Sequence, residues 1–167
     1  MKTRGLKPSS CITAIGIALL LFGGIGSTVA HAAPVHFVSV GSPDGVIVTP
    51  GGDGNYSLVA TVDANGKVSG EWEDAFTRNP GLHMKVTCLT VVGNTAWIGG
   101  VITQASDNAL IGLPTITKVV DNTKDGSGDT ISFTFICGPP CTAPVPCSDM
   151  PGFLVQFPIN AGNVTVK

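Results

Sequence analysis

Polar and apolar residues alternate along much of this chain, with the two-residue period of half-buried β-strands. In DTISFTFI, for example, Ile131, Phe133 and Phe135 alternate with Ser132 and Thr134. No long segment shows the helical period of 3.6 residues, and Gly, Asn, Asp and Pro separate the short apolar runs. We therefore expect an all-β domain, either an antiparallel β-sandwich or a small closed β-barrel of about eight or nine strands.

The segment NYSLVATVDANGKVSGEWED is expected to form a hairpin, and its register can be chosen from side-chain character. A two-residue turn at Asn65–Gly66 would set Leu58 opposite Glu73, which mixes core with surface. A three-residue turn over 64–66 instead pairs Val62 with Val68, Ala60 with Gly70 and Leu58 with Trp72. Cross-strand partners share a face of the sheet, so the second register is favoured, with Gly66 as the left-handed residue.

A second hairpin is expected in LHMKVTCLTVVGNTAWIGGVITQ, with a type II′ turn at Gly93–Asn94. Counting outward from this turn pairs Leu89 with Ile98, Val91 with Ala96, Thr90 with Trp97, Cys88 with Gly99 and Val86 with Val101. Both faces are apolar near the turn, which predicts a central hairpin that is covered on both sides. Further strands are expected at 35–40, 45–49, 114–121, 130–136, 153–157 and 163–166.

The N-terminus has the order of features found in a secretory signal. Three basic residues, Lys2, Arg4 and Lys7, precede an apolar run over 12–22 and the tripeptide Ala30-His31-Ala32. This order predicts a signal helix over 1–32, cleaved before Ala33, and a single domain over 33–167. The alternative is a retained membrane anchor, but glycines and small polar residues dilute the end of the run. A secreted location, periplasmic or extracellular, follows, with no membrane attachment after cleavage.

Charge narrows the choice of partners. All eleven acidic residues but only six of the nine basic residues follow residue 32, so the processed chain carries a net charge of −5. An acidic chain without a basic cluster is a poor ligand for phosphate backbones, which excludes nucleic acid as the expected partner. The partner class that remains is a polymer or a protein at the cell surface or outside the cell.

Four cysteines follow the predicted cleavage site, and three of them lie in FICGPPCTAPVPC. An even count in an exported chain predicts two disulfides. Zinc would require Cys-x2-4-Cys pairs in two places, usually with histidines nearby, whereas the spacings here are x3 and x5. A redox centre would require C-x-x-C, which is absent from this sequence. Prolines keep the Cys/Pro-rich loop over 137–152 out of sheet pairing.

Three disulfide pairings are possible, and we favour Cys88–Cys137 with Cys141–Cys147. Cys88 is expected on the inward face with Val86, and Cys137 continues the inward series of Ile131, Phe133 and Phe135. Gly99, opposite Cys88, leaves room for a sulfur atom. The rival pairings are Cys88–Cys141 with Cys137–Cys147, and Cys88–Cys147 with Cys137–Cys141.

The segments DANGKVSGEWEDAF, VVGNTAWIGGVIT and DNTKDGSGDTISFTF occur in an order that resembles a type of small secreted bacterial β-domain of unknown function. Proteins of this type are stand-alone exported proteins or C-terminal modules of surface proteins. The resemblance covers about residues 44 to 137 and rests on turns, strand glycines and core aromatics. It implies an all-β architecture and no activity.

The segment DNTKDGSGD contains the best candidate for a metal site. Asp121, Thr123, Asp125, Gly126, Ser127 and Asp129 fall at positions 1, 3, 5, 6, 7 and 9 of a calcium loop. The bidentate Glu of position 12 is missing, because Ser132 stands there. An ordinary hairpin turn is therefore favoured over calcium, and no other cofactor is expected.

Catalytic residues are not expected in this chain. It has no G-x-S-x-G motif, and His36 and His83 fall in strand-like segments. Glu71, Glu73 and Asp74 could imitate the carboxylate pair of a glycosidase, but both glutamates project from the face opposite Trp72 and are expected in solvent.

These features favour an exported, disulfide-stapled, non-catalytic β-domain that serves for binding or as a structural module. Two alternatives remain. One is a small barrel that carries an apolar ligand in a cavity lined by Trp72, Trp97, Phe133 and Phe135. The other is a small secreted hydrolase that depends on His83 or Glu73.

Overall fold

The computed structural model describes residues 36–42, 54–76, 81–122, 128–139, 143–159 and 162–167. The predicted signal segment 1–32 and the expected strand 45–49 lie outside these residues. The described residues form β-strands and two short 3-10 turns, and none of their helices could cross a bilayer. The all-β prediction is therefore confirmed.

Ten strands form one antiparallel sheet. They are β1 (His36–Ser42), β2 (Gly54–Val62), β3 (Val68–Phe76), β4 (Leu82–Val92), β5 (Thr95–Gln104), β6 (Pro114–Val120), β7 (Thr130–Ser132), β8 (Phe135–Ile136), β9 (Gln156–Pro158) and β10 (Asn163–Val166). The two 3-10 turns are η1 (Asn108–Leu110) and η2 (Cys147–Asp149). The order across the sheet is β10-β1-β2-β3-β4-β5-β6-β7-β9, and β8 pairs with β6.

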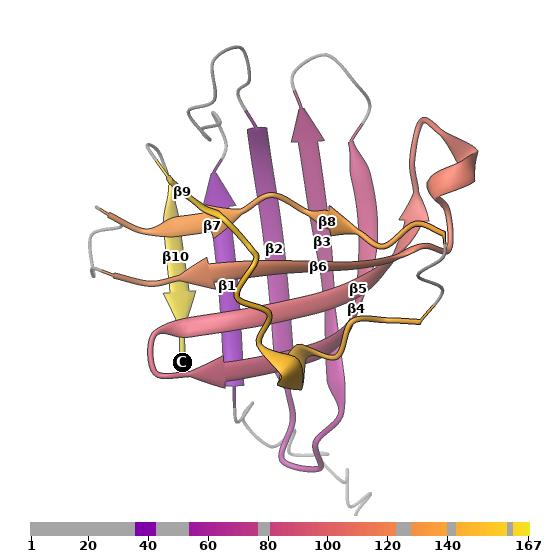
Figure 1. The fold of residues 1–167 in the computed structure, drawn as a ribbon. Coiled ribbons are helices and arrows are strands. Elements are labelled where there is room, and N and C mark those ends of the chain that lie inside the picture. Colours follow the sequence, from indigo (N-terminus) through magenta and orange to yellow (C-terminus); the bar gives the residue numbers. More distant parts are fainter. Residues whose placement is uncertain (1–35, 43–53, 77–80, 123–127, 140–142, 160–161) are drawn as a thin grey trace, which may run out of the picture. The chain divides into compact units, whose positions relative to one another are not determined.

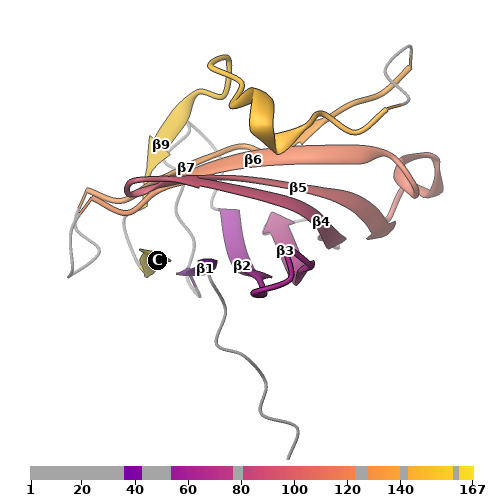
Figure 2. The ribbon, with the colours of Figure 1, turned by 90° about the horizontal axis from the view of Figure 1, so that it is seen from below.

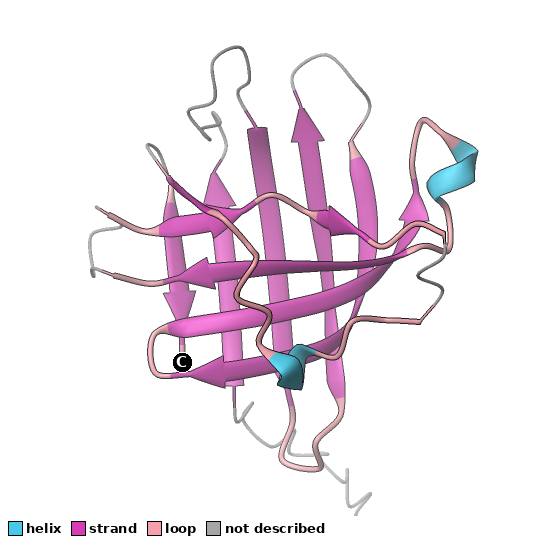
Figure 3. Cartoon of the chain, viewed as in Figure 1, coloured by secondary structure: helices cyan, strands magenta, loops and turns pink. Residues whose placement is uncertain are grey.

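The sheet folds over into two layers whose strands cross. In Figure 1, β1, β2 and β3 run vertically, and β5 and β6 run across them. Figure 2 shows β4 to β7 as one layer and β1 to β3 with β10 as the other, and Figure 3 shows that strands make up most of both layers. One folded sheet replaces the two separate sheets that a sandwich would have.

The bend between the layers lies in β4, which pairs with β3 in one layer and with β5 in the other. Two register shifts interrupt the β4–β5 ladder, one between His83 and Met84 and one between Val86 and Cys88. The extra residue lies in β5 at the first shift and in β4, between Val86 and Cys88, at the second. A bulge bends its strand and increases the local twist, so the second shift helps to explain how β4 can belong to both layers.

The first hairpin has the predicted three-residue register. Leu58 lies opposite Trp72, Ala60 opposite Gly70 and Val62 opposite Val68. Gly66 is left-handed, with φ of 79°, and the backbone N–H of Asp63 donates to the Lys67 carbonyl at 3.0 Å. The register that places core residues opposite core residues is therefore confirmed.

The second hairpin agrees with its prediction only near the turn. Thr90 lies opposite Trp97 and Cys88 opposite Gly99, as expected, and Gly93 has φ of 60°, as a type II′ turn requires. Beyond Cys88 the bulge shifts the ladder, so Val86 lies opposite Gly100 and not Val101. The prediction for Val86 was wrong because the count assumed an uninterrupted ladder.

The segments after β6 also depart from regular alternation. The expected strand 130–136 is divided into β7 and β8, and the one expected at 153–157 begins only at Gln156. Phe133 packs against the inner core, whereas Phe135 is 40% exposed and pairs with Ile116 of the outer core. The inward and outward alternation of side chains is therefore reversed at the break between β7 and β8. The regular alternation of the sequence gives no sign of this reversal.

The two ends of the sheet, β9 and β10, are adjacent in sequence but do not pair with each other among the described residues. Carboxylates cover the free edge of β10 instead. The backbone N–H of Val164 donates to Asp129 Oδ2 at 2.8 Å, and that of Val166 donates to Asp121 Oδ2 at 3.0 Å. We call this contact the carboxylate seam. The expectation of a closed barrel is corrected, because side chains and not a strand ladder meet β10 here.

Two apolar cores lie on opposite faces of the folded sheet. The inner core, between the layers, includes Leu58, Trp72, Met84, Ile98 and Ile131. A smaller outer core consists of Trp97, Ile116, Cys147 and Leu154, with Cys88 and Val145 packed against it. The central hairpin β4–β5 is thus apolar on both faces, as its sequence predicted.

Candidate functional site

The Cys/Pro-rich loop is fastened to the sheet by a disulfide between Cys88 and Cys147, whose Cα atoms lie 5.9 Å apart. Cys88 is on β4 and Cys147 begins η2. A Cβ atom added to Gly99 would lie 2.5 Å from the Cys88 sulfur and 3.1 Å from the Cys147 sulfur. The absence of a side chain at Gly99 therefore makes room for the bridge, as expected, although the partner differs.

The favoured pairing of Cys88 with Cys137, and of Cys141 with Cys147, is corrected by this bridge. The bulge between Val86 and Cys88 reverses the alternation, so Cys88 lies on the outer face with Trp97 and not on the inner face with Val86. Cys137 is buried and is itself disulfide-bonded, but not to Cys88. Cys141 lies outside the described residues.

The bridge holds residues 143–155, which we call the stapled segment, over the outer face of the sheet. Leu154 anchors it in the outer core, next to Trp97 and Ile116. In Figure 2 this part of the chain, with η2, lies on the side of β6 that faces away from β2 and β3. Burial of its apolar anchors and the disulfide together fix the segment on the sheet.

Large apolar side chains remain exposed on and beside the stapled segment. Met150 is 42%, Phe153 56% and Val155 67% exposed. The ring of Phe153 meets that of Phe135 on β8 edge-to-face, with centroids 4.9 Å apart. We call the contacting pair of Phe135 and Phe153 the aromatic patch. Exposed apolar side chains that gather in this way mark binding surfaces more often than isolated ones do.

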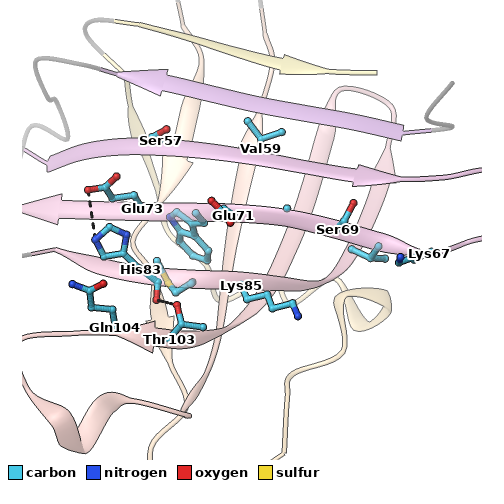
Figure 4. A pocket seen from close by; sticks show the side chains of 14 residues that line it. Ser57, Val59, Lys67, Ser69, Glu71, Glu73, His83, Lys85, Thr103 and Gln104 are labelled. Atoms are coloured by element: carbon cyan, nitrogen blue, oxygen red, sulfur yellow. Dashed lines mark hydrogen bonds and ion pairs between the residues drawn. The ribbon is translucent and has the colours of Figure 1, made fainter. Parts of the chain in front are cut away.

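A second candidate surface is a groove on the outward face of β2 to β5, about 1070 Å³ in volume, which we call the polar groove. Figure 4 shows the side chains that line it; the labelled ones are Ser57, Val59, Lys67, Ser69, Glu71, Glu73, His83, Lys85, Thr103 and Gln104. Cross-strand pairing places Glu71 opposite Lys85 and Glu73 opposite His83. Charges of both signs and hydroxyl groups thus line one concave surface.

The pair of Glu73 and His83 is the nearest approach to an acid–base centre in the polar groove. His83 Nε2 lies 3.8 Å from Glu73 Oε1, and the two side chains are 43% and 51% exposed. Thr103 donates its hydroxyl to the backbone carbonyl of His83 and not to the imidazole. Water screens such a pair, so it can bind a polar ligand but is poorly placed to hold a charged transition state.

The expected calcium residues have a different role where the structure describes them. The Asp129 side chain accepts the backbone N–H of Asn122 at Oδ1 and that of Val164 at Oδ2, both at 2.8 Å. Asp121 accepts from Val166. Thr123, Asp125 and Ser127 lie outside the described residues, and within those residues no three metal-ligating side chains gather. The two described carboxylates, Asp121 and Asp129, thus form the carboxylate seam.

The four aromatics that the apolar-carrier alternative would place around one ligand cavity are divided between the two faces. Trp72 is buried in the inner core and Phe133 packs against it. Trp97 belongs to the outer core and Phe135 to the aromatic patch. These side chains therefore fill two separate sites and do not line a common cavity.

Asp74 is the chemically notable residue that sequence reasoning missed, because it stands in the acidic run EWED and was grouped with its two glutamates. It is completely buried, whereas Glu71 and Glu73 are exposed. Burial raises the pKa of its carboxyl group from 3.8 to about 6, and the hydrogen bond that Thr134 donates offsets a smaller part of this shift. Burial and the charge of Asp74 also raise the pKa of the Tyr56 hydroxyl. The even-numbered series of Val68, Gly70 and Trp72 was a signal for this inward position.

Within the described residues, the polar groove, the aromatic patch and the buried Asp74 are thus the three features that could bind a ligand or a proton. Comparisons of the chain with protein families, with curated proteins and with solved structures find no match.

Proposed function

We propose that this chain is an exported, disulfide-stapled, non-catalytic β-domain that serves as a binding or structural module at or outside the cell surface. The observation that carries the proposal is the aromatic patch, in which the exposed ring of Phe153, on the segment that a disulfide holds in place, packs against the exposed ring of Phe135 on β8. Holding exposed aromatic side chains rigid reduces the entropy lost on binding, as an efficient binding surface requires.

The compartment is inferred from two independent features. The order of basic residues, apolar run and Ala30-His31-Ala32 favours export, and disulfides persist in oxidising compartments. The likeness to small secreted bacterial β-domains of unknown function supports the same proposal. A partner at the cell surface, either a polymer or a protein, would be met there.

A co-sedimentation experiment tests the binding function. The purified chain is mixed with washed envelope of the organism that encodes it, and the bound fraction is measured for wild type and for the double variant Phe135→Ser/Phe153→Ser. We expect the double variant to bind at least about tenfold less, because truncation of central aromatic side chains typically costs 2 kcal/mol or more.

The matched control is Glu71→Gln/Lys85→Gln, which removes a cross-strand charge pair from the polar groove and leaves the aromatic patch intact. Its binding should equal that of wild type. A loss confined to this control would move the binding surface to the polar groove. No binding of the wild-type chain to the envelope would contradict the proposal.

The two alternatives have less support. An apolar carrier predicts a bound apolar molecule in native mass spectrometry, but its four aromatics occupy two faces of the sheet. A hydrolase predicts activity that is lost in His83→Ala or Glu73→Gln, but this pair is half exposed and 3.8 Å apart.

A further inference from the structure

Asp74 connects the two layers of the sheet from within. It lies on β3, opposite Tyr56 of β2 and Leu82 of β4, and its side chain points between the layers. The Thr134 hydroxyl, from the break between β7 and β8 in the other layer, donates a hydrogen bond to Asp74 Oδ2. This bond joins parts of the chain that are 60 residues apart.

The carboxylate has few partners for a fully buried acid. Asp74 Oδ1 and the Tyr56 hydroxyl are both buried and make no hydrogen bond within the described part of the chain. Of the elements packed against Asp74, β2 contributes Tyr56, β4 contributes the apolar Leu82, and the β7–β8 break contributes Thr134. The charged neighbours in sequence and register, Glu73 and His83, form their ion pair on the opposite face.

Within the described residues, Asp74 has one hydrogen-bond donor and no cation beside it. Such a buried carboxylate is costly when ionised and tolerable when protonated. Two responses relieve the ionised form: it takes up a proton, or the surrounding structure opens and admits water. The segment most able to open is the β7–β8 break, because Phe133 and Thr134 belong to neither strand and β8 has only two residues.

We propose that Asp74 is a proton-controlled tie between the two layers, which holds the β7–β8 break against β3 when it is protonated and releases the break when it is ionised. The closed form binds the proton more tightly than the open form, in which water solvates the carboxylate. Because Phe135 of the aromatic patch lies on β8, release at higher pH would also loosen one side of that patch.

Hydrogen exchange of the purified full chain tests the tie. Backbone protection factors, corrected for the intrinsic effect of pH, are compared at pH 5 and pH 7.5. We expect protection of the amides of residues 133–136 to fall about 10-fold between these pH values, because the closed form releases its proton in this range whereas the open form, with the ordinary pKa of 3.8, is already ionised. Amides in the β2–β3 hairpin should not show this change.

Three variants separate the tie from a purely structural contact. In Asp74→Asn, which cannot ionise, the pH dependence at 133–136 should disappear. Thr134→Val keeps the shape but removes the donor to the carboxylate, so the midpoint of the change should move to higher pH. Glu71→Gln, on the exposed face, should behave as wild type.

A titration of the Asp74 carboxyl carbon by NMR in the wild-type chain covers the case in which Asp74→Asn does not fold. We expect a midpoint near pH 6. A midpoint near the ordinary value of 3.8, or equal pH dependence in wild type and Asp74→Asn, would overturn the proposal.

Discussion

Glu73 and Asp74 are neighbours with the same functional group, yet the pleat of β3 places them in opposite environments. The Glu73 side chain is 51% exposed beside His83, whereas Asp74 is completely buried. A carboxylate in water retains its solvation, but a buried one loses it unless protein groups replace the water. One step along a strand therefore decides whether an acid is a surface charge or a proton-binding group.

This difference predicts how stability depends on pH. The folded pKa of Asp74, about 6, exceeds the unfolded value of 3.8, so its contribution is fully present below 3.8 and is lost as pH rises through 6. Between pH 4 and pH 7.5 the free energy of unfolding of the wild-type chain should therefore fall by about 2.5 kcal/mol through this group, and Asp74→Asn should show no such fall. Urea denaturation across this range measures it.

The comparison variant for this prediction is Glu73→Gln, which should follow the wild-type pH profile because the side chain is exposed. Parallel profiles for wild type and Asp74→Asn would show that Asp74 is hydrated in solution and that the burial argument fails.

At the scale of elements, carboxylates and a disulfide provide contacts that strand pairing does not. The carboxylate seam covers the edge of β10 with Asp121 and Asp129. The Asp129 backbone carbonyl also accepts the N–H of Ile159 at 2.9 Å, just after β9. Asp129 therefore holds together the chain after β6, the end of β9 and the strand β10. On the outer face, the disulfide similarly fixes a segment that forms no strand.

The carboxylate seam can be tested with a matched pair of aspartates. Asp129 is buried and accepts two backbone N–H groups, whereas Asp63 accepts two, from Asn65 and Lys67, in an exposed turn. We expect Asp129→Ala to lower the free energy of unfolding by about 3–5 kcal/mol, since buried donors lose their partner, and Asp63→Ala by about 1 kcal/mol. Chemical denaturation gives both values, and equal losses would contradict the role of burial.

The disulfide leads to a prediction about how the cysteines are paired and how much each bridge stabilises the fold. We expect peptide mapping without reduction to recover Cys88 joined to Cys147, and Cys137 joined to Cys141 as the remaining pair. With a sequence separation of 59 between its cysteines, the first bridge should contribute about 4 kcal/mol in the chain-entropy picture. The double variant Cys88→Ser/Cys147→Ser should therefore melt at a much lower temperature than Cys137→Ser/Cys141→Ser, which opens a short loop. The reverse order of melting temperatures would count against this account.

At the scale of the whole molecule, one folded sheet encloses the inner core, and the outer core adds a second apolar layer beneath the stapled segment. Within the described residues, the polar groove and the aromatic patch are the two candidate binding surfaces. If residues 1–32 are removed as predicted, a net charge of −5 would disfavour binding to acidic polymers. The aromatic patch offers apolar contacts, and the polar groove offers hydroxyl groups and charges of both signs.

Export of the chain is the prediction at this scale. Expressed with its own N-terminus in a bacterium, the protein is expected outside the cytoplasm and shortened by residues 1–32. Intact mass and N-terminal sequencing should place Ala33 first. Retention of residues 1–32 in the membrane fraction would support the anchor alternative instead.

The sequence by itself was sufficient for the all-β class and for the register of the first hairpin. Both depend on local alternation and on short turns, which neighbouring residues specify directly. The same logic placed Cys88 opposite Gly99 and could have placed Asp74 on the inward face, because its position has the parity of Trp72.

Tertiary structure alone decided the disulfide partner, the carboxylate seam and the division of the aromatic residues. The bulge beside Cys88 and the break between β7 and β8 each reverse the side-chain alternation, and neither has a local sequence signal. The seam requires β10 to arrive beside Asp121 and Asp129, and β10 is placed there by its pairing with β1. These features arise from how a folded sheet brings distant segments together, whereas periodicity reports only the neighbours of each residue along the chain.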